Sequence, residues 1–299
     1  MIHGWIVLDK PVGLGSTTAV SAVKRILRQA GEPKTKVGHG GTLDPLASGV
    51  LPIALGEATK LAGRMLDATK TYAFTIRFGE ETDTLDAEGR VVATSDVRPD
   101  LSEINAALPR FTGEIDQVPP AYSALKIDGK PAYARARAGE DLEMKSRRAV
   151  IHELKPIASS AEDITLSATV SKGTYIRSLA RDIAHAVGTV GHVTMLRRTR
   201  AGPFGLDQAI SLDFLEEAAK ARQLDGAVRP LSAALDDIPA LPVTPEQAQL
   251  LRHGQRLSGF PATPGLQLAL RDGTPVALVE ATADGLTVVR GFNLLDVAE

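Results

Sequence analysis

The chain has 299 residues, enough for one large domain and one small one. Its hydrophobic fraction of 43 % is typical of a globular protein, and no apolar run reaches the roughly 20 residues needed to cross a bilayer. The absence of cysteine excludes disulfides, thiol nucleophiles and thiolate metal sites. Because the N-terminus also lacks a signal-peptide pattern, we expect a cytoplasmic protein with no membrane partner.

The net charge of −2 is weak evidence against a nucleic-acid partner. The charges are unevenly distributed, however. Residues 1–210 carry a small excess of basic side chains and the remainder an acidic excess, and basic residues cluster at 24–28, 126–148 and 197–200. Taken alone, such runs favour solvated surfaces. They would indicate a nucleic-acid interface only if one face of the molecule collected them.

The first elements predicted are a strand and a helix. Residues 5–9, WIVLD, form an apolar run typical of a short buried strand. Ser16 stands at the N-cap position before apolar residues at helical spacing, and Gly31 marks the end of that helix. After a glycine-rich loop, the sequence predicts an apolar strand at 50–56 and a short helix at 59–66.

Residues 70–79, KTYAFTIRFG, alternate between two faces, with Tyr72 on the more apolar one, and predict a half-buried strand. Residues 81–89, ETDTLDAEG, predict a polar turn. They do not fit a calcium loop. If Asp83 were position 1 of such a loop, Leu85 would stand at position 3, where an oxygen ligand is needed. Further strands are predicted near 111–118, 147–156, 164–171 and 191–198, and helices near 99–108, 131–139, 174–187 and 211–222.

Residues 118–148 combine prolines, glycines and most of one basic cluster, and predict an irregular excursion from the α/β body. Long irregular loops in compact domains tend to be functional.

The chain changes character near residue 238. Thr244 and Pro245 predict a helix start and Gly254 its end. Asp-Gly turns at 272–273 and 284–285 then join short strands with β-branched residues. The pattern predicts a small β-rich domain.

The loop GHGGTLDPL, residues 38–46, surrounds the single acid Asp44 with glycines. It lacks the G-K-[ST] ending of a P-loop and the G-x-G-x-x-G spacing of a dinucleotide site. His39 and Asp44 are too few ligands for a metal site. Taken alone, Asp44-Pro45 favours a turn in which the carboxylate caps backbone N–H groups.

Five motifs change that interpretation. They are LDKPVG (8–13), GHGGTLDPLASGVLPIALGEATK (38–60), KTYAF (70–74), SKGTYIRSLARD (171–182) and HVTMLRR (192–198). Together they closely resemble the bacterial tRNA pseudouridine-55 synthases, which convert one uridine of the tRNA T arm to pseudouridine. The resemblance spans roughly residues 4–205. It includes an insertion at 111–133 that is similar to the family's substrate-gripping segment. Gly40 departs from it, since many members have Thr there; we expect little consequence at a loop position.

The resemblance implies an α/β (α+β) pseudouridine synthase fold with a mixed, largely antiparallel sheet and a small C-terminal PUA-like β domain. We expect a catalytic domain at 1–237, with an RNA-gripping insertion at about 111–148, and an RNA-binding domain at 238–299. The local patterns alone support only a mixed α/β region followed by a small β region.

Pseudouridine formation breaks the C1′–N1 bond, turns the uracil, and joins its C5 to C1′. No redox change or net hydrolysis occurs, so neither cofactor nor metal is required. A carboxylate is required, as a nucleophile or as a base, and the resemblance assigns this role to Asp44. Arg177 matches the arginine that pairs with it, and Tyr72 the tyrosine that stacks on the base. Glycines around Asp44 would let the RNA backbone approach closely.

The target base lies in a folded arm and must be flipped into a pocket. The resemblance implies that Tyr175 and Leu196 contact this base, and that His39 contacts the flipped nucleotide or the space it vacates. Lys10 and Arg198 are expected phosphate contacts. Without the resemblance, Tyr72 would be interpreted as a core aromatic residue, Arg177 as a surface cation and His39 as structural.

The expected partner is the T stem-loop of tRNA, bound by a monomer that needs no protein partner. Two alternatives are a tRNA-binding folding helper without catalysis and the catalytic subunit of a guide-RNA-dependent pseudouridylation complex. The complete set of Asp44, Tyr72 and Arg177 argues against the first. The insertion at 111–133 and the short C-terminal region argue against the second.

Overall fold

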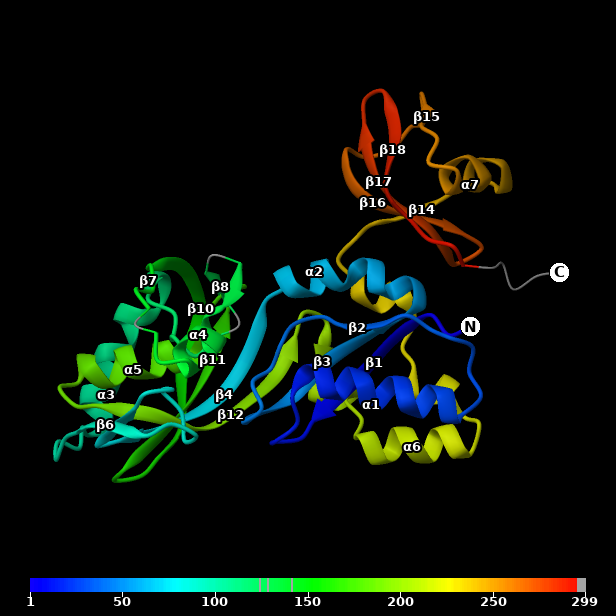
Figure 1. The fold of residues 1–299 in the computed structure, drawn as a ribbon. Helices are drawn as coiled ribbons and strands as arrows, with labels where there is room; N and C mark the ends of the chain where they lie inside the picture. The colour runs from blue at the N-terminus through cyan, green and yellow to red at the C-terminus, as the bar shows by residue number, and fades with distance from the viewer. Residues whose placement is uncertain (124, 128, 141, 295–299) are drawn as a thin grey trace.

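The computed structural model describes residues 1–123, 125–127, 129–140 and 142–294 (Figure 1). Residues 124, 128 and 141 of the predicted insertion and residues 295–299 of the predicted C-terminal domain lie outside the described residues. The main strands are β1 (Gly4–Lys10), β2 (Val37–His39), β3 (Ala47–Leu55), β4 (Lys70–Phe78), β7 (Gly113–Gln117), β10 (Arg147–Ser159), β11 (Asp163–Val170), β12 (Gly191–Ala201) and β13 (Phe204–Gly205).

These nine strands form one sheet in the order β1-β3-β12-β4-β11-β10-β7, with β2 paired to β3 and β13 paired to β12. The pair β3–β12 is parallel, and the other pairs are antiparallel. The predicted mixed, largely antiparallel sheet is therefore confirmed. The strands expected from residues 5–9, 50–56 and 70–79 are β1, β3 and β4.

The helices of the N-terminal body, which holds this sheet, are α1 (Ser16–Gln29), α2 (Ala62–Asp67), α3 (Leu101–Ala107), α4 (Ala132–Arg137), α5 (Ile176–Ala186) and α6 (Leu212–Lys220). Helices α1 and α6 pack on β1 and β3, while α3 and α5 pack on β4, β10 and β11. Figure 1 shows these two pairs at opposite ends of the long strands β4 and β12. The middle of the sheet thus lies between two packed cores. No helix in the described residues is long and apolar enough to span a membrane.

The start of α1 differs from the prediction. Its N-cap is Gly15, and Ser16 makes no capping bond. The Ser16 Oγ instead donates to Leu43 O (2.9 Å) and accepts from Leu43 N (2.8 Å). The hydroxyl that the sequence suggested as a helix cap therefore fastens α1 to the loop that carries Asp44.

The polar turn predicted at 81–89 is confirmed, and it connects β5 (Glu80–Thr82) to β6 (Val91–Thr94). Its tip is fixed to β12 by two backbone hydrogen bonds: Val193 N donates to Leu85 O (3.0 Å), and Ala87 N donates to Val193 O (3.1 Å). This contact brings Asp86 towards the middle of the sheet.

The C-terminal region contains α7 (Pro245–Arg252), β14 (Ala240–Pro242), β15 (Leu257–Ser258), β16 (Gly265–Arg271), β17 (Thr274–Thr282) and β18 (Gly285–Gly291). The strands form a five-stranded sheet in the order β14-β16-β17-β18-β15. Thr244 and Gln247 close a capping box at α7. Asp272 and Gly273 have φ of 48° and 80°, as a tight hairpin turn requires. The predicted small β domain is confirmed.

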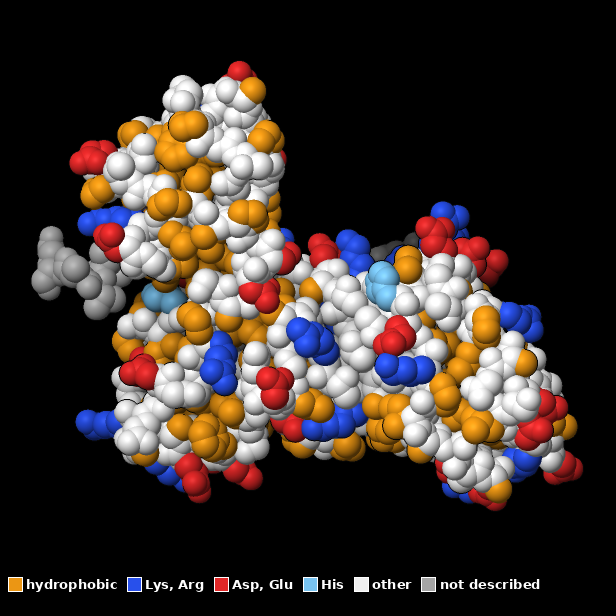
Figure 2. All heavy atoms as spheres, turned by 180° about the vertical axis from the view of Figure 1, so that it is seen from behind, with side chains coloured by type: hydrophobic (Ala, Val, Ile, Leu, Met, Phe, Trp, Pro, Cys, Tyr) orange, Lys and Arg blue, Asp and Glu red, His pale blue; other side chains and the backbone are white. Residues whose placement is uncertain are grey.

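This domain also shares a hydrophobic cluster with the N-terminal body. Leu268, Leu278 and Phe292 pack in the same cluster as Trp5 and Met65. Figure 2, which views the molecule from behind, shows hydrophobic side chains continuing from the C-terminal domain to its junction with the body. The boundary near residue 238 stays a prediction, but the two units are joined by buried contacts.

Candidate active site

The parallel pairing of β3 with β12 assembles the candidate site from separate motifs. Leu196 lies opposite Ala47 of β3, three residues after Asp44. On its other side β12 pairs with β4, where Arg198 lies opposite Tyr72. The loop before β3 and two neighbouring strands therefore place four predicted site residues together in the middle of the sheet.

A cavity of about 330 Å³ opens at this point, at the lower end of the ~300–1,000 Å³ range of small-ligand pockets. The predicted residues that line it are Asp44, Tyr72, Tyr175, Arg177, Leu196 and Arg198. Lys10 and His39 are absent from the described lining. Most of the predicted site is thus brought together.

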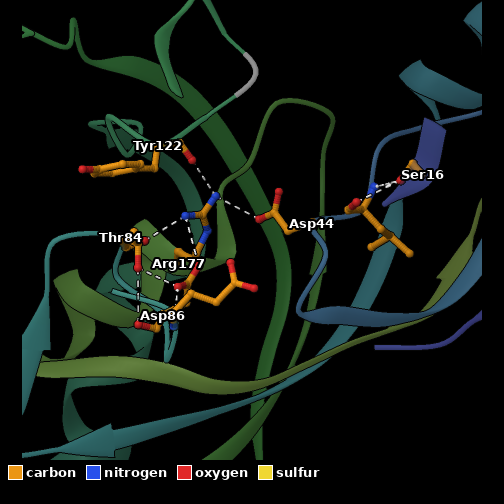
Figure 3. Close-up of polar contacts among 8 residues, drawn as sticks. Ser16, Asp44, Thr84, Asp86, Tyr122 and Arg177 are labelled. Atoms are coloured by element: carbon orange, nitrogen blue, oxygen red, sulfur yellow. Dashed lines mark hydrogen bonds and ion pairs between the residues drawn. The ribbon is translucent and has the colours of Figure 1, made fainter. Parts of the chain in front are cut away.

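Arg177, the second residue of α5, is buried at the centre of a polar network (Figure 3). Its Nη2 lies 2.9 Å from Asp44 Oδ2 and donates to Tyr122 O (2.9 Å). Its Nη1 donates to Thr84 O (2.8 Å) and lies 3.2 Å from Asp86 Oδ2. Both ends of the planar guanidinium are therefore occupied, which fixes its orientation.

Asp86 is the functional residue that the sequence prediction missed. Leu85 adopts a left-handed φ of 63°, uncommon for a residue with a side chain, which lets the turn aim both Thr84 O and the Asp86 carboxylate at Arg177. Asp86 Oδ1 accepts from Thr84 Oγ1 (2.6 Å) and Glu88 N (3.1 Å), leaving Oδ2 for Arg177. Nothing in the spacing of the acids at 81–89 indicates which one faces inward.

The two carboxylates on Arg177 differ in exposure. The side chain of Asp86 is 10 % exposed and that of Asp44 is 43 % exposed. Within the described part of the chain, Asp44 Oδ1 has no protein partner, whereas Oδ2 is held by Arg177. Asp44 O accepts from Ala47 N (3.0 Å), so the turn exists, but the predicted carboxylate cap does not. One oxygen is positioned and the other is available to a ligand.

Lys10 does not lie where a phosphate contact would be. It is fully buried, and its Nζ donates to Pro11 O (2.9 Å), Leu14 O (2.6 Å) and Pro45 O (3.3 Å). Burial lowers its pKa to about 8, although nearby Asp44 opposes this shift. The expected phosphate role is corrected: Lys10 holds the backbone beside Asp44.

Arg198 has the same kind of role. It is 1 % exposed, and its Nε donates to Val50 O (2.7 Å) while its Nη2 donates to Gly41 O (3.1 Å). The glycine-rich loop and the strand β3 that follows it are thereby both attached to β12. Its side chain also borders the cavity, and a phosphate contact by Arg198 stays a prediction.

Gly40 of the loop and Gly49 of β3 lie where a side chain would collide with neighbouring protein atoms. A Cβ on Gly40 would lie 2.5 Å from Met65 Cβ, and one on Gly49, where φ is +101°, would lie 2.1 Å from Arg198 O. Position 40 is therefore closely packed in this chain, while the small effect expected of having glycine there instead of threonine stays a prediction. At Gly40 and Gly49, the close approach that the missing Cβ permits is made by the protein's own atoms and not by RNA.

His39 lies on β2, and its Nδ1 accepts a long hydrogen bond from Gly41 N (3.4 Å). Burial and the charge of Arg198 lower the pKa of this imidazole, which favours the neutral form that can accept that bond. In this structure His39 supports the loop from outside the cavity, and a contact with the nucleotide stays a prediction.

Two family models match this chain. One, described as "TruB family pseudouridylate synthase (N terminal domain)", matches residues 24–176; the other, "tRNA pseudouridylate synthase B C-terminal domain", matches residues 177–236. The chain is also 61 % identical over 304 residues to the tRNA pseudouridine synthase B of Novosphingobium aromaticivorans, with 100 % of both chains covered. The chain belongs to the TruB family. It is a tRNA pseudouridine synthase and thus an isomerase, as the motifs predicted.

Other similarities agree with this assignment. The tRNA pseudouridine synthase B of Zymomonas mobilis is 59 % identical, with 98 % of this chain and 96 % of the relative covered. A chain in a Cbf5-Nop10-Gar1 complex superposes with a TM-score of 0.72 at 27 % identity, covering 96 % of this chain and 84 % of that one. A chain of an H/ACA RNP bound to a substrate RNA containing 2′-deoxyuridine has a TM-score of 0.74 at 24 % identity, covering 98 % of this chain and 86 % of that one, which shows a shared fold.

Asp86→Asn tests the network around Arg177. The amide keeps the shape but removes the charge that balances the buried guanidinium, so Arg177 should hold Asp44 less firmly. We expect turnover of tRNA to fall about 10- to 100-fold, with tRNA affinity within a few fold. Single-turnover rates and equilibrium binding measure the two effects. Glu88→Gln removes a charge from an exposed position in the same turn and should be silent. Equal rates for both variants would contradict a role for Asp86.

Lys10→Met tests the buried ammonium group through pH. The unfolded chain keeps the ordinary lysine pKa of 10.5, so between about pH 8 and 10.5 it binds more protons than the folded chain. In that window the contribution of Lys10 to the free energy of unfolding rises with pH. Wild type should therefore gain stability relative to the variant from pH 8 to 10, and the difference should be constant below pH 8. Urea denaturation at each pH measures it; a flat difference throughout would contradict the lowered pKa.

Proposed function

We propose that this enzyme converts uridine 55 in the T arm (TΨC loop) of tRNA to pseudouridine, by flipping the base and using Asp44 as the essential acid, without a cofactor. The observation that carries the proposal is the Asp44–Arg177 pair at the cavity, with one carboxylate oxygen held and the other free. The T-arm position is supported by the five motifs, which resemble the pseudouridine-55 synthases. As a tRNA enzyme, it would work in the cytoplasm and act as a monomer.

The roles of the lining residues follow from their chemistry. The carboxylate of Asp44 is the group that can bond to an electron-poor C1′ or accept a proton. Arg177 keeps this carboxylate oriented. Tyr72 offers a ring for the flipped base to stack on, and Leu196 an apolar contact beside it. Tyr175 lines the same cavity from the N-cap of α5.

The RNA backbone needs cations that are exposed. Lys172 meets this condition at the cavity rim, with a side chain that is 65 % exposed and paired with Asp67 (2.8 Å). Such exposed pairs are weak, so a phosphate could replace the carboxylate at little cost. Arg147 and Arg148 of the insertion are also exposed. The back of the molecule, in contrast, shows basic and acidic side chains intermingled (Figure 2).

The two alternatives are less well supported. Membership of an enzyme family argues against a folding helper without catalysis. The full-length identity of 61 % to a tRNA pseudouridine synthase B, against 27 % to the chain in the Cbf5 complex, favours a stand-alone enzyme over a guide-RNA-dependent subunit.

Asp44→Asn tests the proposed chemistry. The amide has nearly the same shape but no charge, so the variant should fold, bind tRNA and lose at least roughly 1,000-fold in pseudouridine formation. Mapping of pseudouridine along an unmodified tRNA transcript, with melting curves alongside, measures each property. Asp96→Asn, at an exposed position remote from the cavity motifs, is the matched control. Normal turnover by Asp44→Asn, or product at a position other than 55 in wild type, would contradict the proposal.

Replacing Arg147 and Arg148 with Ala tests the insertion as an RNA grip. If both residues contact phosphate, the slope of log K against log salt should flatten by up to about two, and binding should weaken. Filter binding of tRNA across a salt series measures the slope. The control pair Lys24→Ala and Arg28→Ala removes the same charge from exposed positions on α1, at the other end of the sheet. An unchanged slope for the insertion variant would show that its two arginines face solvent in the complex.

A further inference from the structure

A buried hydroxyl without a partner faces the cavity. Ser123, in the insertion, is 4 % exposed and belongs to the cavity lining. Among the described residues, none forms a hydrogen bond with its Oγ. A buried hydroxyl is normally hydrogen-bonded, because losing water without gaining a partner is unfavourable. An orphaned hydroxyl in the wall of a binding cavity is therefore a feature that a ligand would complete.

The position of Ser123 is fixed by its neighbours in the chain. Gln117 Nε2 donates to Tyr175 O (3.0 Å), and Gln117 Oε1 accepts from Tyr175 N (2.8 Å). Tyr122 O accepts from Arg177 Nη2 (2.9 Å). The segment 117–123 is thus attached to the start of α5 at two points, through Gln117 to Tyr175 and through Tyr122 to Arg177. Ser123 follows directly after the residue that holds the arginine, so its backbone is placed beside Arg177.

Two other polar side chains in the same wall are already engaged. Lys70 Nζ donates to Met65 O (2.8 Å) and to Ala68 O (2.6 Å). Thr174 Oγ1 donates to Ser171 O (2.9 Å). These groups have little left to offer a ligand, whereas Ser123 can still both donate and accept.

We propose that Ser123 Oγ donates a hydrogen bond to a carbonyl oxygen of the flipped uracil, and so holds the base while it is detached from the sugar. The proposal rests on the proposed function. A flipped nucleotide enters base first, so a deeply buried group meets the base, and exposed rim groups such as Lys172 meet the backbone. The base also needs a contact once the C1′–N1 bond is broken, because it is then no longer tethered.

The two possible roles of Ser123 predict opposite effects of Ser123→Ala. If the hydroxyl serves the substrate, its removal takes away an unpaired polar group, so the melting temperature should stay the same or rise. At the same time kcat/KM on a T-arm hairpin should fall about tenfold. The control Thr189→Val removes a buried hydroxyl that does have a partner, Val97 O (2.9 Å), away from the cavity lining. It should lower the melting temperature and leave kcat/KM unchanged.

Substrate analogues identify the atom that Ser123 contacts. Hairpins carrying 2-thiouridine, 4-thiouridine or 2′-deoxyuridine at the target position are compared with the unmodified hairpin, using wild type and Ser123→Ala. Sulfur accepts hydrogen bonds poorly, so the tenfold penalty should shrink below about twofold with one of the two thio substrates and persist with the 2′-deoxy substrate.

Each other outcome overturns the proposal. A penalty that persists with both thio substrates excludes a base contact, and one that disappears only with 2′-deoxyuridine assigns the hydroxyl to the ribose. A lowered melting temperature with unchanged kcat/KM assigns it to the fold. Wild type that forms no pseudouridine in the unmodified hairpin overturns the proposed function itself, whereas an active wild type with an equally active Ser123→Ala overturns the contact alone.

Discussion

The site depends on how one buried cation is held. Arg177 contacts two carboxylates, Asp44 and Asp86, and two backbone carbonyls, so its position is determined from several directions. Asp86 lies in the protein interior and balances the guanidinium charge, while Asp44 lies on the cavity side. Removing a partner from such a pair leaves a buried charge uncompensated, which is why the network acts as a unit. The orientation of the Asp44 carboxylate follows from this arrangement.

Distant parts of the chain meet at this cation. The turn at 84–86 reaches it from a small hairpin, Tyr122 reaches it from the insertion, and Asp44 reaches it from the loop before β3. The insertion, which is expected to grip RNA, thus contacts the same nitrogen of Arg177 that holds Asp44. The position of the insertion and the position of Asp44 are therefore physically linked. Lys10 and Arg198 hold the loop and the start of β3 in place, because their side chains donate hydrogen bonds to backbone carbonyls there.

Much of this could be predicted from the sequence. Alternation at 70–79 and the Asp-Gly turns report local backbone preferences. The motif strings pointed to Asp44, Arg177 and Tyr72, which the structure brings to one cavity. What failed depends on tertiary contacts. Ser16 has the chemistry of a helix cap but bonds to Leu43, and lysine at position 10 is as consistent with a phosphate contact as with a buried brace. Asp86 was missed because the backbone at Leu85, and not the order of residues, decides which acid in the turn faces inward.

The central claim is that the planar, two-ended contact of Arg177 positions Asp44 for reaction. Arg177→Lys tests it most directly, because lysine keeps the charge but lacks the fork that reaches both carboxylates. The measurement is the single-turnover rate of pseudouridine formation at saturating tRNA, with the Kd for tRNA determined in parallel. The rate should fall roughly 100-fold or more while Kd stays within a few fold. A near-normal rate would show that charge alone suffices and that the network does not set the geometry of Asp44.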